Sequence, residues 1–187
     1  MTQAMSQPLT LEKFLKLPET KPASEFVDGT IIQKPMPKGK HSRLQLKLCS
    51  EINTVAETQG IAYAFPELRC SFGTRSVVPD VAVFYWPRIA FDANGEPEDD
   101  VLTYPDWVIE ILSPDQRPNR VIDNIVYCLK AGCQLGWLID PEDRTVTIYQ
   151  PETLPMFCEG MDALTVLDEI SLSITAGQLF DLLKMQR

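Results

Sequence analysis

Two acidic residues occur inside segments whose apolar character predicts burial. Asp80 follows a proline in the run VVPDVAVFY, and Glu110 lies near the end of the run WVIEIL. A buried carboxylate needs a cation, hydrogen-bond donors or a metal ion, because leaving it unpaired is costly. Two carboxylates that converge form a good oxygen site for Mg²⁺ or Mn²⁺, and such an ion promotes phosphodiester hydrolysis. The structural alternative is that Asp80 caps a turn and Glu110 pairs with an arginine such as Arg69 or Arg75.

Positive charge is concentrated near the N-terminus of an otherwise acidic chain. Seventeen Lys and Arg against 26 Asp and Glu give a net charge of −9, which argues against nonspecific DNA binding by the whole surface. Residues 34–47 contain basic residues and no acid. We expect this segment to form a basic strip that faces DNA; the alternative is a solvated loop. The residues of the basic strip are Lys34, Lys38, Lys40, His41 and Arg43. His41 could contact a phosphate from a helix N-terminus, or pack locally.

Several other classes of function lack support in the sequence. The chain has no Walker A motif and no G-x-G-x-x-G, so we expect no nucleotide cofactor, and no G-x-S-x-G elbow marks a serine hydrolase. Five cysteines without a C-x-x-C pair, together with a single histidine, predict buried reduced thiols rather than a zinc site. No stretch approaches the ~20 apolar residues of a membrane span, and no secretion signal is visible, so we expect no membrane association and a cytoplasmic location.

The elements that must position the acids follow from the periodicity of apolar residues and from turn signals. Helices are predicted at 10–17, 41–58, 120–131 and 176–184, and a hairpin at 25–33 around Asp28-Gly29. Strands are predicted at 61–65, 69–72, 76–85, 106–112, 136–139 and 145–149, with short ones at 164–166 and 172. We therefore expect a single α/β (α+β) domain over residues 1–187, with a central sheet, an added N-terminal hairpin, and C-terminal strands plus a helix.

The acidic segments and their neighbours resemble the PD-(D/E)xK nuclease superfamily, and more specifically the Uma-type family of restriction-endonuclease-like proteins. The ordered matches cover roughly residues 10–150 and comprise SEFVDGTII, His41 at the start of a long helix, VVPDVAVF, PDWVIEILSPD and GCQLGWLIDP. The resemblance implies a restriction-endonuclease-like core, in which helices flank a central mixed sheet. It also implies an Mg²⁺-dependent or Mn²⁺-dependent endonuclease that hydrolyses DNA.

Carried over residue by residue, the resemblance implies that Asp80 and Glu110 are catalytic metal ligands and that the backbone carbonyl of Ile111 completes the inner shell. A further carboxylate is expected from Glu51; the competing acids are Glu25 and Glu67.

The chain departs from the family at the catalytic lysine. Leu112 stands two residues after the second acid, and Asn124 stands where the family places a lysine on the following helix. Asn124 could orient a water, and Arg117 or Arg120 could supply positive charge, although arginine is a poor base. Two functions stay open: a nuclease that acts on DNA, and an inactive nuclease-fold protein that binds DNA or a protein partner. A third, a metal-dependent hydrolase of small molecules, has no support beyond the carboxylates. The sequence does not decide whether the protein forms a homodimer.

Overall fold

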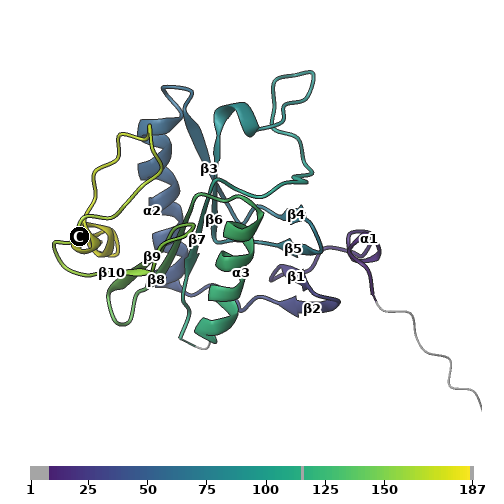
Figure 1. Cartoon of the computed structure of the whole chain (residues 1–187), viewed down its shortest axis with the longest axis horizontal. Helices are drawn as coiled ribbons and strands as arrows, with labels where there is room; N and C mark the ends of the chain where they lie inside the picture. The colour runs from purple at the N-terminus through teal and green to yellow at the C-terminus, as the bar shows by residue number, and fades with distance from the viewer. Residues whose placement is uncertain (1–8, 115, 186–187) are drawn as a thin grey trace, which may run out of the picture.

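The computed structural model describes residues 9–114 and 116–185, and its centre is a mixed six-stranded sheet (Figure 1). The strand order is β10-β9-β8-β7-β6-β3, and β7 and β8 pair in parallel while the other neighbours are antiparallel. The strands are β3 (Ala62–Pro66), β6 (Val81–Tyr85), β7 (Trp107–Ile111), β8 (Leu135–Asp140), β9 (Thr145–Tyr149) and β10 (Met156–Cys158). The ends of the expected domain (residues 1–8 and 186–187) and residue 115 lie outside the described residues.

A smaller antiparallel sheet with the order β2-β1-β5-β4 lies beside the central one. Its strands are β1 (Ser24–Val27), β2 (Thr30–Gln33), β4 (Cys70–Phe72) and β5 (Arg75–Val77). The predicted hairpin is confirmed: β1 and β2 pair, and both Asp28 and Gly29 have positive φ angles, 48° and 87°. Such angles suit a tight hairpin turn, which favours the Asp-Gly dipeptide.

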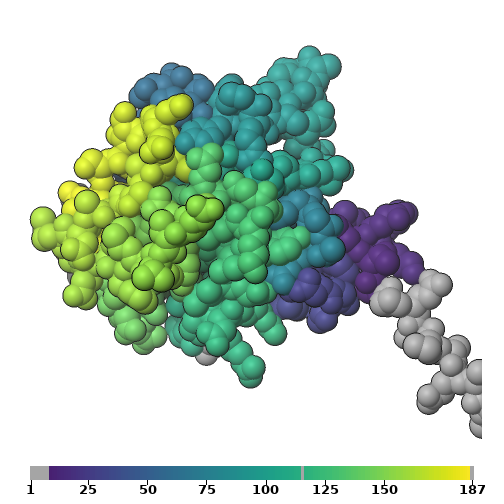
Figure 2. Space-filling view, in the orientation of Figure 1, coloured from purple at the N-terminus to yellow at the C-terminus, as the bar shows by residue number. Residues whose placement is uncertain are grey.

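Helices cover both faces of the central sheet, as expected. Alternate residues of its strands point to opposite faces, and the buried side chains separate accordingly into two clusters. Those on one face pack against α2 (Gly39–Ala56) and α4 (Ala176–Asp181), and those on the other pack against α3 (Pro118–Ala131). Two short elements complete the order, α1 (Leu11–Phe14) and the 3-10 turn η1 (Trp86–Arg88). Figure 2 shows that the C-terminal segments cover the side opposite the N-terminal hairpin.

The prediction of one continuous strand over residues 76–85 is wrong. The segment forms β5 in the small sheet and β6 in the central sheet, separated by Val78, Pro79 and Asp80. Pro79 has no N–H for a ladder, and the Val78 N–H donates to Glu25 Oε1 at 2.8 Å instead. The chain therefore changes sheets at the first candidate acid.

The C-terminal third also differs from expectation. Residues 164–166 and 172 form no strand; Leu164, Leu167 and Ile170 pack into the core as irregular chain. A short edge strand, β10, forms instead beside β9.

All five cysteines are free and buried, as predicted. Among the described residues, no helix has the length and apolar character needed to cross a bilayer.

The packing of α3 on β8 depends on a glycine. A Cβ atom at Gly136 would lie well inside van der Waals contact with Cγ2 of the fully buried Ile125. We expect Gly136→Ala to lower the free energy of unfolding by about 1–3 kcal/mol through overpacking, measured by urea denaturation.

The matched control is Gly39→Ala in the first turn of α2, where an added Cβ meets nothing within 4 Å. This variant should be neutral or slightly stabilising, because alanine favours helix. Equal effects of the two substitutions would contradict the close approach of α3 to β8.

Candidate functional site

Asp80 lies at the break between the two sheets and is held by three neighbouring elements. Its Oδ2 accepts the backbone N–H of Ile111 at 2.7 Å, which joins β6 to the end of β7. Its Oδ1 accepts the Lys34 ammonium at 2.7 Å and lies 3.3 Å from His41 Nε2 on α2. Its backbone carbonyl accepts Gln45 Nε2 at 2.8 Å. The carboxylate is therefore fixed in one orientation at a buried position.

Glu110 lies beside Asp80, and one of its oxygens has no hydrogen-bond partner in the part of the chain that the structure describes. It points from β7 to the face covered by α3 and is 2 % exposed. Its Oε2 lies 3.7 Å from Lys34 Nζ, whereas its Oε1 is buried and forms no hydrogen bond with residues 9–114 or 116–185. An orphaned buried carboxylate oxygen is rare in folded proteins and calls for a ligand or cation.

Lys34 is the positive charge between these two acids. It follows β2, at the end of the hairpin, and its ammonium also donates to the carbonyl of Val78 at 2.6 Å. Burial alone would raise the pKa of Asp80, but Lys34 and then His41 outweigh it and lower the pKa to about 2. Burial raises the pKa of Glu110 well above its ordinary value, because the more distant Lys34 offsets it only in part and Asp80 adds repulsion.

A third carboxylate, Glu25 on β1, lines the same pocket. It accepts the Val78 N–H, and Asn124 on α3 donates its amide to both of its oxygens, at 3.3 and 3.1 Å. Asn124 therefore ties α3 to the hairpin, with its amide engaged by Glu25.

The acids open into a pocket of about 490 Å³ between the hairpin and the start of α3. Besides Glu25, Lys34, Glu110 and Asn124, its lining includes Ile32, Gln33, Pro35, Gln116, Arg117, Arg120 and Val121. Arg117 and Arg120 are exposed, so their charge lies at the mouth of the pocket.

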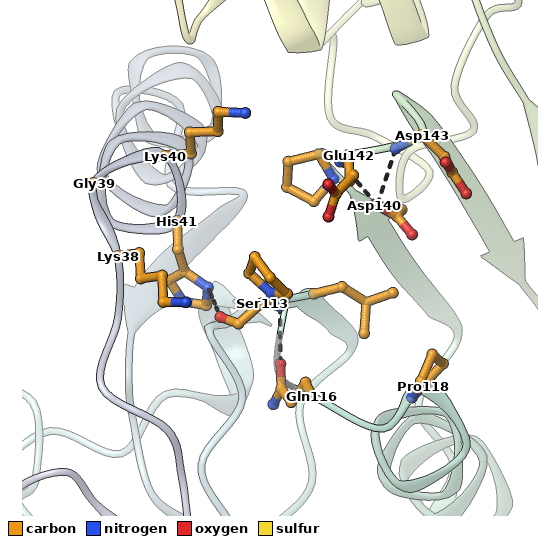
Figure 3. A pocket seen from close by; sticks show the side chains of 13 residues that line it. Lys38, Gly39, Lys40, His41, Ser113, Gln116, Pro118, Asp140, Glu142 and Asp143 are labelled. Carbon is orange, nitrogen blue, oxygen red and sulfur yellow. Dashed lines mark hydrogen bonds between the residues drawn. The ribbon is translucent and has the colours of Figure 1, made fainter.

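A second pocket, of about 570 Å³, adjoins the first and shares Gln116 with it (Figure 3). The start of α2 forms one side with Lys38, Lys40 and His41, and the turn after β8 forms the other with acidic side chains of residues 140–143. Between them, Ser113 Oγ lies 3.4 Å from His41 Nδ1. His41 thus links the second pocket to Asp80.

The structure brings some of the expected site residues together and separates others. Glu110 and Asn124 line the first pocket, and Lys38, Lys40 and His41 line the second. Asp80 lines neither pocket but contacts Lys34 of the first, and the main chain of Ile111 donates to Asp80.

Two residues lie elsewhere. Glu51 is further along α2 and, within the described part of the chain, lines neither pocket, whereas Glu25 lines the first. Arg43 turns away from the basic strip and donates to the carbonyls of Leu182 and Lys184 at 2.8 and 2.7 Å, which satisfies the end of α4.

The side chains and main chain at this site can supply some, but not all, of the ligands that a divalent cation needs. Asp80, Glu110 and the main chain of Ile111 offer oxygen ligands of the kind that Mg²⁺ and Mn²⁺ prefer. Of these oxygens, Glu110 Oε1 is not engaged in a hydrogen bond within the described residues. In residues 9–114 and 116–185, no three His, Cys, Asp or Glu side chains gather closely enough to form a complete metal site. Water and substrate oxygens would have to supply the remaining ligands, which is common for Mg²⁺.

Sequence reasoning placed Lys34 on a DNA-facing surface and did not identify Gln45 at all. Lys34 is instead turned inward, with a side chain 12 % exposed, and Gln45 is buried on the sheet-facing side of α2. A signal for Gln45 was available, because it lies one turn after His41 on the apolar face of the helix.

Comparisons with known proteins agree with the expected family and fold. The sequence pattern of the Uma2 family, described as "Putative restriction endonuclease", matches residues 11–177. The solved structures that match include one from Anabaena variabilis ATCC 29413, described as "a putative nuclease belonging to DUF820". It is 51 % identical, with a TM-score of 0.90, over 95 % of this chain and 100 % of that chain. A search of curated proteins gives no match.

The low pKa of Asp80 should make stability depend on pH in a defined window. Its ordinary pKa is 3.8 and its folded value is about 2, so the ionised carboxylate stabilises the fold above pH 3.8 and loses this effect as the pH falls to about 2. At ~1.4 kcal/mol per pKa unit the contribution is about 2 kcal/mol. We expect the difference in unfolding free energy between the metal-free wild type and Asp80→Asn to shrink by about that amount across this window.

Urea denaturation at several pH values measures this difference. The other carboxyl groups are common to both proteins, so their titration largely cancels. A difference that stays constant across the window would show that Lys34 and His41 do not stabilise the Asp80 carboxylate.

Proposed function

Because the chain belongs to the Uma2 family of restriction-endonuclease-like proteins, we propose that it is a divalent-cation-dependent endonuclease that hydrolyses DNA phosphodiester bonds. One observation carries this proposal: the buried Glu110 Oε1 has no hydrogen-bond partner among the described residues, and Glu110 lies beside the fixed carboxylate of Asp80. A cation there would satisfy both the orphaned oxygen and the excess negative charge.

Asp80, Glu110 and the backbone carbonyl of Ile111 would hold Mg²⁺ or Mn²⁺. When bound, such an ion lowers the pKa of a water and stabilises the charge that develops on the phosphate. The protein's own contribution is orientation. The Ile111 N–H fixes one oxygen of Asp80, Gln45 fixes its main chain, and burial keeps bulk water away from Glu110.

Basic side chains near the acids could bind the phosphates of a nucleic-acid backbone. Arg117 and Arg120 stand at the mouth of the first pocket, and Lys38 and Lys40 line the second. Such residues position phosphates without reading sequence. The acidic turn after β8, with Glu142, faces the lysines across the second pocket and would repel a phosphate chain. DNA should therefore follow the α2 side of this groove.

Removal of either carboxylate tests the function. Wild type should bind Mn²⁺ saturably in calorimetry and nick supercoiled plasmid, and EDTA should abolish nicking. We expect Asp80→Asn and Glu110→Gln to lose Mn²⁺ binding and to nick at least about 100-fold more slowly, the usual scale for removing an electrostatic contact to a developing charge.

Two further variants serve as comparisons. Glu25→Gln changes a carboxylate that lines the pocket and should slow nicking, whereas Glu51→Gln should not, because Glu51 lies away from it. Metal binding without nicking by wild type would favour the inactive nuclease-fold alternative. Conversion of plasmid to the linear form, rather than the nicked form alone, would support two copies acting together on one duplex.

A further inference from the structure

The acidic site contains a lysine, Lys34, whose ammonium lies beside both central acids and which comes from the end of the hairpin. Neither position at which a lysine was expected can supply positive charge, since Leu112 is apolar and the Asn124 amide is engaged by Glu25. Lys34 Nζ lies 2.7 Å from Asp80 Oδ1 and 3.7 Å from Glu110 Oε2, and the residue lines the pocket that Glu110 also lines.

The position of this ammonium is fixed by the backbone at both ends. The Lys34 N–H donates to the carbonyl of Ala23 at 2.9 Å, which continues the hairpin pairing by one residue. The ammonium donates to the carbonyl of Val78 at 2.6 Å, within the break between the two sheets. Lys34 is therefore anchored by its main chain, and its charged end is directed to the two acids.

The arginines of the pocket do not take this position. Arg117 and Arg120 are exposed at its mouth, so their charge is screened by solvent and lies outside the buried part of the site. Among the cationic side chains that line this pocket, Lys34 is therefore the one beside Asp80 and Glu110.

We propose that Lys34 is the catalytic cation of this site, and that its ammonium would lie next to the divalent cation that Asp80 and Glu110 would hold. The inference rests on the proposed function and adds the residue that replaces the missing lysine. Lys34 acts by donating hydrogen bonds to a non-bridging phosphate oxygen as negative charge accumulates there; no proton is transferred from it. Since a cation at Asp80 and the ammonium repel each other, removing the ammonium must strengthen cation binding while weakening catalysis.

The test is Lys34→Met, which keeps the length and the apolar stem of the side chain. We expect calorimetry to show Mn²⁺ binding at least about tenfold tighter than in wild type, because a competing unit charge has been removed at short range. We expect plasmid nicking at saturating Mn²⁺ to be at least about 100-fold slower. The control is Lys130→Met, an exposed lysine on α3, which should change neither quantity.

Opposite changes in the two measurements separate this role from a structural one. If Lys34 only joined the hairpin to the break, the Lys34→Met variant would bind Mn²⁺ as tightly as wild type or more weakly. Either of these affinities overturns the inference. Nicking by the folded variant at the wild-type rate also overturns it. If Lys34→Met does not fold, Lys34→Gln replaces it, because its amide can still donate to Val78. Absence of nicking by wild type refutes the proposed function itself, and the Mn²⁺ affinities still decide whether Lys34 lies next to the divalent cation.

Discussion

The short break between β5 and β6 is the feature on which the rest of the structure depends. Its main-chain groups are bound by side chains from other elements: the Val78 N–H by Glu25, the Val78 carbonyl by Lys34 and the Asp80 carbonyl by Gln45. The Asp80 carbonyl also accepts the backbone N–H of Glu67 at 3.2 Å. A buried polar group left without its partner costs about 1–3 kcal/mol. The contacts that join the hairpin sheet to the central sheet are therefore the same contacts that build the acidic site.

The pKa values of Asp80 and Glu110 shift in opposite directions because Lys34 lies at unequal distances from the two acids. The ammonium is a full ångström closer to Asp80 than to Glu110, so Asp80 is the carboxylate that it stabilises and Glu110 is the one that burial disfavours. Buried ion pairs seldom increase stability over well-packed apolar residues, because desolvation offsets their attraction. An arrangement of three acids and one lysine at this depth is therefore better explained by chemistry than by folding.

Sequence alone predicted most elements and both central acids, and the reasons for its failures are physical. Periodicity located α2, α3 and the strands around Glu110, because those patterns are local. The break at Pro79 was missed because the β-branched run around it outweighed the missing N–H, although a proline inside a strand pattern argues for a break. Lys34 and Arg43 were assigned to a basic surface because their partners, Asp80 and the carbonyls after α4, are distant in sequence. Charge along the chain gives no information about such contacts.

The hydrogen bonds between Asn124 and Glu25 join residues 99 positions apart, and those between Lys34 and Asp80 join residues 46 apart. Contacts of such long sequence separation close large loops and form slowly. On the ribosome, the hairpin is synthesised long before α3 leaves the exit tunnel. Glu25 and Lys34 therefore lack their partners Asn124 and Asp80 until those residues have been synthesised. The acidic site is consequently absent from a nascent or half-folded chain and forms only when the tertiary structure is complete.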